Sequence, residues 1–182
     1  MNDDILYIEQ FLGGNVSGFE SLVRRYQDRV LNIVYSLIGS DHESEDIAQE
    51  VFLKVYHNLR SFRQSSEFST WLYRITVNTT TSFLRKRKKF VRDEGILEST
   101  PSDNKNPKDV LLIKEKTEMV ERALKKIPVK FRTAMVLKDI EGLSYLDISK
   151  VLRCSIGTVE SKIYRARLCL KVELTRLGGG VL

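Results

Sequence analysis

The sequence predicts an all-α protein made of two small helical modules joined by a flexible linker. Apolar residues recur at helical spacing along most of the chain, and no segment shows the sustained alternation of a strand. Turn-forming residues gather at 91–108, where this periodicity stops. The 182 residues suffice for two small domains but not for a large multidomain enzyme. We expect modules at 1–92 and 113–177, a linker at 93–112 and a flexible tail at 178–182.

The first module has three predicted helices. A capping pattern at Ser17 begins a helix that Gly39 ends. The same pattern at Ser40 begins a second helix, which is predicted to bury Ile47, Ala48, Val51, Phe52, Val55 and Leu59. After a polar loop at 60–69, a third helix is expected at about 70–89, with Trp71, Leu72, Ile75 and Phe83 as its core residues.

The second module contains a helix-turn-helix pattern. A helix capped at Asn106-Pro107 and another from Pro128 to Gly142 precede it. A short helix, Tyr145 to Leu152, and a long helix from Ser155 to about Arg176 form the motif. The short helix is predicted to pack through Leu146, Ile148, Val151 and Leu152, and the long one through Val159, Ile163 and Ala166.

Composition excludes several classes of protein. Hydrophobic residues make up 42% and charged residues 30%, the balance of a folded chain rather than of a disordered or membrane protein. Two cysteines and two histidines are too few for a disulfide framework or most metal sites, so we expect no cofactor and no small-molecule substrate. The start, Met1 to Asp4, is acidic where a signal peptide would be basic, which indicates a cytoplasmic protein.

Charge is segregated along the chain. Residues 41–50 hold five acidic residues and no Lys or Arg, whereas 85–89 is an unbroken basic run. Residues 128–182 carry 10 Lys and Arg against 5 Asp and Glu. Such segregation predicts a polyanionic partner, such as nucleic acid, and a separate protein partner. A frayed, solvated helix end is the alternative interpretation of the basic run.

The helix-turn-helix pattern predicts a DNA-binding face. The first residues of the second helix of such a motif reach base edges in the major groove. The residues expected on the open face are Ser155, Ile156, Gly157, Thr158, Glu160, Ser161, Lys162, Arg165 and Arg167. The three long basic side chains among them are expected to pair with phosphates or with guanine. An ordinary helical hairpin with a solvated basic face is the alternative.

A second nucleic-acid site is predicted where aromatic, basic and polar residues interleave, in the loop at 60–69 and the helix after it. Rings stack on unpaired bases and cations follow the phosphate backbone of a single strand. The candidate contacts are Phe62, Arg63, Gln64, Ser65, Phe68, Trp71, Arg74 and Asn78. For Trp71, a core position is the first expectation and a nucleic-acid contact the second.

A protein-docking face is predicted on the helix that follows Ser40. Asp46, Gln49 and Glu50 share one side of this helix, opposite its apolar stripe. An acidic and amide stripe beside a complete core suits a basic partner helix. A solvated helix face is the alternative.

The order of these motifs resembles a known family. In chain order they are Asp46 to Phe52, Phe62-Arg63, Phe68 to Ile75, Asn78 with the basic run, Pro128 to Arg132, Glu141 to Tyr145 and Gly157 to Arg167. This succession resembles the extracytoplasmic-function (ECF) group of the bacterial sigma-70 family over about residues 16–175.

The resemblance implies a promoter-specificity subunit of RNA polymerase and not an enzyme. The first module would be a sigma-2 helical bundle, whose face with Asp46, Gln49 and Glu50 docks on the clamp helices of the β′ subunit. Its loop, with Asn78, would capture the non-template strand of the −10 element and flip out a base. The second would be a sigma-4 module that reads the −35 element as duplex. Contact with the β subunit and an inhibitory anti-sigma factor, often membrane-anchored, is also implied.

Three positions depart from the family pattern and leave the promoter sequence open. Ser82 stands where Asp is common, Glu160 where Lys or Arg is common, and Arg153 where Gly is frequent. Two rival functions also stay open. A plain helix-turn-helix repressor or activator would leave the loop and the acidic stripe without a role. A nucleic-acid enzyme would need a metal-spaced cluster or a phosphate loop, and neither is visible in the sequence.

Overall fold

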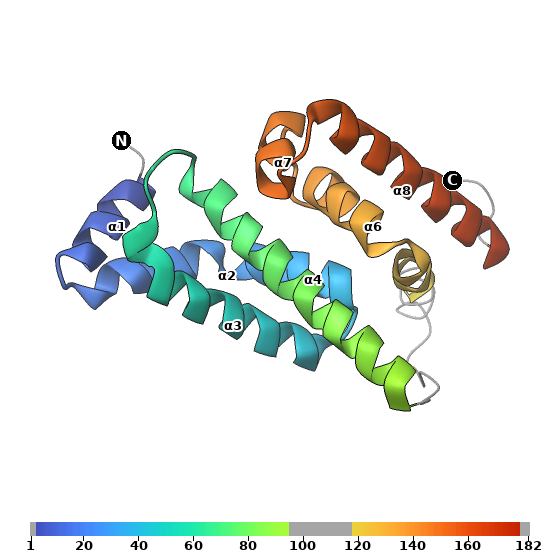
Figure 1. The fold of residues 1–182 in the computed structure, drawn as a ribbon, viewed down its shortest axis with the longest axis horizontal. Helices are drawn as coiled ribbons and strands as arrows, with labels where there is room; N and C mark the ends of the chain where they lie inside the picture. The colour runs from blue at the N-terminus through green and yellow to red at the C-terminus, as the bar shows by residue number, and fades with distance from the viewer. Residues whose placement is uncertain (1–2, 95–117, 179–182) are drawn as a thin grey trace, which may run out of the picture.

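The computed structural model describes residues 3–94 and 118–178, and the ordered elements within these ranges are all helical (Figure 1). The first module consists of α1 (Asp3–Leu12), α2 (Val16–Ile38), α3 (Asp41–Asn58), the 3₁₀ turn η1 (Leu59–Ser61) and α4 (Phe68–Glu94). The second consists of a helix at 118–126, α6 (Val129–Met135), the π-helical turn η2 (Val136–Ile140), α7 (Tyr145–Leu152) and α8 (Ile156–Arg176). The all-α prediction is confirmed. The predicted cap at Asn106-Pro107 lies outside the described residues.

Most helix ends lie where short-range signals place them. Gly39 ends α2 with φ 72°, a left-handed conformation that favours glycine. The Ser144 and Ser155 side chains accept hydrogen bonds from backbone N–H groups and so cap α7 and α8. The predicted cap at Ser17 is wrong, because the Asn15 side chain accepts a bond of 3.0 Å from the Ser17 N–H and α2 begins at Val16, two residues earlier than a cap at Ser17 implies.

The core of the first module lies between α1, α2, α3 and α4. Its fully buried side chains include Ile8, Leu22, Ile33, Leu37, Val51, Leu59 and Leu72. Burying each aliphatic side chain of this size contributes about 1.5–3 kcal/mol. Helix α1 crosses α2 at the buried Gly18, where the two backbones approach closely. Helix α4 packs on α2 and α3 in this bundle, and the loop between η1 and α4 lies on the surface.

The two modules pack directly against each other, which periodicity alone did not predict. Figure 1 shows α6, α7 and α8 as a group beside the bundle, and α7 contacts α4 while η2 contacts α2. Buried residues of both modules form one continuous cluster. Two polar contacts cross this interface or border it: Tyr35 donates to Glu121 at 2.8 Å, and Arg29 donates to the Tyr73 hydroxyl at 3.3 Å.

Packing within the helix-turn-helix follows the prediction except at one position. Ile148, Val151, Val159, Ile163 and Ala166 are all buried, as expected. Leu146 is 52% exposed, so its assignment to the packed face is wrong. Helix α7 has only eight residues, and its inward face is complete with two buried side chains.

Candidate nucleic-acid interfaces and a docking groove

The loop between η1 and α4 carries an exposed set of predicted contacts. Arg63, Gln64 and Ser65 are exposed, and Phe62 is half-buried. The Phe62 ring lies 5.4 Å from the Trp71 ring, centroid to centroid. The two rings therefore form one aromatic ledge at the start of α4, with polar and basic side chains beside it.

Phe68 is a correction to the predicted site. Its side chain is 2% exposed, and its ring packs against those of Phe62, Trp71 and Tyr26. A buried ring has no face for a base, so Phe68 supports the ledge from below and is not a contact. Periodicity did not separate it from its neighbours, because the loop before it has no helical register.

One row of side chains, half-buried at Trp71 and Arg74 and exposed at Asn78, continues along α4 from the ledge. Trp71, Arg74 and Asn78 follow at intervals of three and four residues, which places them on one side of the helix. Asn78 is exposed, whereas Thr76, Val77, Thr79 and Thr80 around it are buried. Farther along, Arg85, Lys86, Lys88 and Lys89 are exposed, and Arg87 pairs with Glu43 at 2.9 Å. The row leads into a strongly basic helix end.

The three predicted docking residues are all exposed on α3, and each of the two carboxylates has a neighbouring side chain as a partner. Asp46 lies 3.2 Å from the His42 ring nitrogen. Glu50 pairs with Lys54 at 2.6 Å, and the same ammonium donates to Thr79 on α4. Gln49 points into a groove beside this stripe. Each carboxylate is thus oriented by a neighbour but remains open to a partner.

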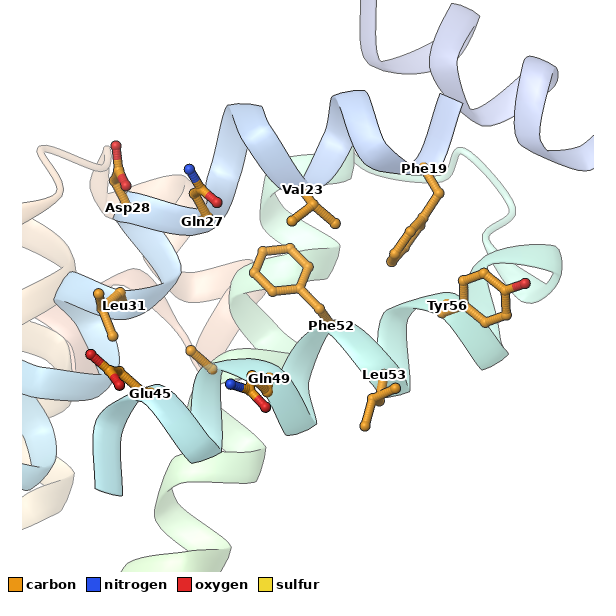
Figure 2. A pocket seen from close by; sticks show the side chains of 11 residues that line it. Phe19, Val23, Gln27, Asp28, Leu31, Glu45, Gln49, Phe52, Leu53 and Tyr56 are labelled. Atoms are coloured by element: carbon orange, nitrogen blue, oxygen red, sulfur yellow. The ribbon is translucent and has the colours of Figure 1, made fainter. Parts of the chain in front are cut away.

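A groove of about 540 Å³ runs between α2 and α3 (Figure 2). Its lining side chains are Phe19, Val23, Gln27, Asp28, Leu31, Glu45, Ala48, Gln49, Phe52, Leu53 and Tyr56. The lining is mostly apolar, with polar and acidic side chains toward the Asp28 and Glu45 end. A mixed groove of this kind suits an amphipathic helix with a basic end.

Sequence reasoning missed this groove. It assigned Ala48 and Phe52 to the core, but both are only partly buried and line the groove wall. The usable signal was Leu53, an apolar residue outside the predicted stripe, which is 61% exposed. Leu53 and Tyr56 are both exposed and lie on the same helix. Grouped exposed apolar side chains of this kind are typical of a surface that binds another molecule.

The predicted face of the helix-turn-helix is open. Ser155, Ile156, Gly157, Thr158, Glu160, Ser161 and Arg165 are all exposed. Lys162 is half-buried, because its ammonium turns back to 3.7 Å from the Cys154 sulfur at the turn. The first two turns of α8 therefore present polar, small and charged side chains together.

The two arginines near the middle of α8 differ in their surroundings. The Arg165 guanidinium lies 5.7 Å from the centroid of the Phe131 ring and makes no ion pair with any described residue. Arg167 binds Asp139 through two hydrogen bonds, and this pairing raises the pKa of Arg167. Asp139 lies in the π-helical turn, so it was not placed near α8 by sequence. Its carboxylate competes with any phosphate for Arg167.

Other kinds of site find no support in the described part of the chain. Within residues 3–94 and 118–178, no group of three His, Cys, Asp or Glu side chains has the arrangement of a metal site. No helix in these ranges is long and apolar enough to cross a membrane.

Two family models match the chain. One is described as Sigma-70 region 2 and matches residues 22–90, and the other as Sigma-70, region 4, and matches residues 117–170. The first covers the bundle with the aromatic ledge, and the second covers the helix-turn-helix.

Curated relatives match over nearly their whole length. The ECF RNA polymerase sigma factor SigW of Bacillus subtilis is 35% identical, with 93% of this chain and 96% of the relative aligned. The ECF RNA polymerase sigma-E factor of Escherichia coli K12 is also 35% identical, over 92% of this chain and 91% of that relative.

Solved structures agree. The sigma factor RpoE, in complex with the anti-sigma factor NepR from Bartonella quintana, superposes with a TM-score of 0.71 at 25% identity over 86% of this chain and 96% of its own. CnrH, in complex with the cytosolic domain of CnrY, shares the fold with a TM-score of 0.74 at 24% identity, over 96% of this chain and 99% of its own.

Proposed function

Because the chain belongs to the extracytoplasmic-function group of the sigma-70 family, we propose that its two modules divide promoter recognition between single-stranded and duplex DNA. The chain is an alternative sigma factor that directs RNA polymerase to promoters. In the proposal, residues 1–92 dock on core polymerase and capture the −10 element, and residues 113–177 read the −35 element. Residues 93–112 link the modules, and 178–182 form a tail. The observation that carries the proposal is the row on one side of α4 in which the half-buried ledge and Arg74 are followed by the exposed Asn78 and then by a basic helix end.

The −10 strand is captured at the aromatic ledge. An unstacked base lies against Phe62 and Trp71, while Gln64, Ser65 and Asn78 offer hydrogen bonds to its edges and Arg63 and Arg74 face the phosphates. Breaking duplex stacking costs roughly 1.4 kcal/mol per step. A base stacked on an aromatic ring returns about 1–3 kcal/mol. One captured base thus offsets one or two steps, and core polymerase supplies the remainder.

The −35 element is read by α8. Its N-terminal residues, Ser155 to Ser161, enter the major groove and meet base edges, and Lys162 and Arg165 bind phosphates. Glu160 accepts a hydrogen bond from a cytosine amino group, which makes it a candidate for sequence discrimination. Arg167 contributes only where a phosphate displaces Asp139.

Core polymerase is bound through the groove and the acidic stripe together. Apolar residues of a β′ clamp helix fill the groove between α2 and α3, and basic residues of that helix face Asp46, Gln49 and Glu50. The acidic end of the groove, with Asp28 and Glu45, supports a basic partner. The second module contacts the β subunit.

An anti-sigma factor holds the chain inactive, as NepR binds the sigma factor RpoE in the solved structure from Bartonella quintana. An exposed apolar row on α8 supports a protein partner for the second module as well: Tyr164, Leu168 and Val172 are 70%, 52% and 49% exposed. We place the chain in the cytoplasm, with its inhibitor free or anchored in the membrane. It acts by binding and not by catalysis.

Run-off transcription with core polymerase tests the proposal. Adding the chain should produce transcripts from a defined set of start sites that core polymerase alone does not use. The chain should also co-purify with core polymerase in a one-to-one complex. A repressor or activator would bind duplex DNA without joining the polymerase. Start sites that do not change when the chain is added would refute the proposal.

A further inference from the structure

Two described residues other than glycine have a left-handed backbone, and each lies in a turn of one candidate DNA interface. Gln64, with φ 52°, lies in the loop before α4, and Arg153, with φ 50°, lies in the turn before α8. In this conformation the Cβ atom crowds the backbone, so glycine or asparagine is usual there. Backbone strain of this kind is common at functional sites, where the side chain contributes to binding or catalysis rather than to the stability of the fold.

Arg153 holds this conformation because α7 ends there. Its N–H donates to the Ser149 carbonyl, and the next N–H, of Cys154, donates to the same carbonyl at 3.1 Å. The backbone at residue 153 must therefore be left-handed, and glycine would satisfy it without strain. The Arg153 side chain is exposed and makes no hydrogen bond or ion pair with the rest of the described chain. The fold gains nothing evident from an arginine here.

The surroundings of Arg153 are basic and adjoin the proposed duplex-reading face. The neighbouring residue, Cys154, has the Lys162 ammonium 3.7 Å from its sulfur, so a second cation lies over the turn. The nearest acidic side chain on α7, Asp147, is already paired with Lys150 at 3.7 Å. Two residues after Arg153, α8 begins with its exposed face. An unpaired guanidinium thus lies where the DNA backbone flanks the major groove.

We propose that Arg153 binds a backbone phosphate of the −35 duplex and fixes the angle at which α8 enters the groove. The proposal rests on the proposed function and adds a contact to it. A guanidinium binds a phosphate through two parallel hydrogen bonds, which positions a helix without reading sequence. The cost of the left-handed arginine is then offset only when DNA is bound.

The decisive variant is Arg153→Gly, because stability and DNA binding should change in opposite directions. Relief of strain should raise the melting temperature of the full chain by about 2–4 °C. Loss of one phosphate contact should weaken holoenzyme binding to a duplex carrying a mapped promoter roughly three- to tenfold and reduce the slope of log K against log salt by about 0.9. The weakening should be similar for a shuffled duplex of the same length, because a phosphate contact is blind to sequence.

Three control variants separate charge from backbone freedom. Arg153→Asn also tolerates the left-handed backbone and should reproduce both changes. Arg153→Lys keeps the charge and the strain, and it should leave the melting temperature and the salt slope nearly unchanged. Lys126→Gln removes an exposed charge outside the turn and should have little effect on binding.

Particular results overturn the proposal. An unchanged salt slope in Arg153→Gly would show that residue 153 meets no phosphate, and a lower melting temperature would show that the arginine serves the fold. A loss confined to the promoter sequence would indicate a base contact instead. In each of these cases the proposed function stands if the wild-type chain still directs initiation. If the wild-type chain does not direct initiation, the proposed function and the phosphate contact of Arg153 are both refuted.

Discussion

Gly18 allows α1 to pack closely against α2 because it has no side chain. A Cβ at this position would lie 2.3 Å from the Tyr7 carbonyl oxygen and 2.9 Å from the Phe11 nitrogen, both backbone atoms. Replacing glycine by alanine inside a helix normally stabilises it by up to about 1 kcal/mol. Here α1 must move instead, so we predict that Gly18→Ala lowers the free energy of unfolding by about 1–3 kcal/mol. Urea denaturation of the variant and the wild type measures this change in the free energy of unfolding.

Gly157→Ala is the matched control. Gly157 also lies within a helix, but no atom is within 4 Å of its added Cβ. This variant should be at least as stable as the wild type, and any loss of duplex binding then reports on the DNA face rather than on folding. Equal stabilisation by both substitutions would contradict the close approach of α1 and α2.

The exposed Asn78 on α4 predicts a selective defect. Asn78→Ala removes an amide that should bond the flipped base, so capture of the non-template −10 strand should weaken by about tenfold. The affinity for duplex −35 DNA should not change, because α8 is untouched. Fork-junction and duplex probes bound to holoenzyme measure the two affinities separately.

Asn32→Ala is the control for that variant, because Asn32 is exposed on α2 and belongs to neither DNA face. It should behave as the wild type with both probes. A parallel loss of both affinities in Asn78→Ala would show that the substitution disturbs the bundle and that Asn78 is no base contact.

Arg165 and Arg167 on α8 should differ as their surroundings do. Arg165 lies over the Phe131 ring and makes no ion pair within residues 3–94 and 118–178, so Arg165→Ala should lower the salt slope of duplex binding by about 0.9. Arg167 is already neutralised by Asp139, so Arg167→Ala should change the slope much less. Titrating holoenzyme binding at several salt concentrations decides this, and identical slopes for both variants would contradict the structural distinction.

These contrasts also show what the sequence could and could not predict. Caps and periodicity predicted α7, α8 and their buried residues, because those signals act within a few neighbouring positions. They did not predict that Phe68 is covered by other rings, that Asp139 reaches Arg167 or that Leu53 borders a groove. Each of these depends on a residue distant in sequence. A helical pattern shows which side chains share a face but not what covers that face.

The packing of one module on the other has a consequence for promoter binding. Helix α4 has 27 residues and so spans about 40 Å, and α7 lies against it. The −10 and −35 elements lie roughly 25 base pairs apart, or about 85 Å along B-DNA at 3.4 Å per pair. A chain that reads both elements at once must therefore separate its modules. The contacts between them set the free energy of that step.

Glu141 lies at this interface and makes it sensitive to pH. Burial raises the pKa of Glu141 above its ordinary value, and the nearby Arg29 opposes the shift only in part. An acid whose pKa is raised in the folded state favours folding when protonated, so its contribution is present at low pH and is lost as pH rises through the raised pKa. At neutral pH the partly buried carboxylate destabilises the packed arrangement.

We therefore predict that Glu141→Gln raises the melting temperature of the full chain at pH 7 to 8 and that the increase vanishes near pH 4, where the wild-type side chain is protonated. The amide keeps the shape of the side chain and carries no charge to bury, so the difference isolates the cost of ionisation. Glu160→Gln, at an exposed position on α8, serves as the control and should show no such dependence. Melting curves recorded across this pH range give the answer. A decrease in melting temperature at pH 7 to 8 that shrinks as pH falls would mean that the attraction to Arg29 outweighs burial and that the carboxylate holds the modules together.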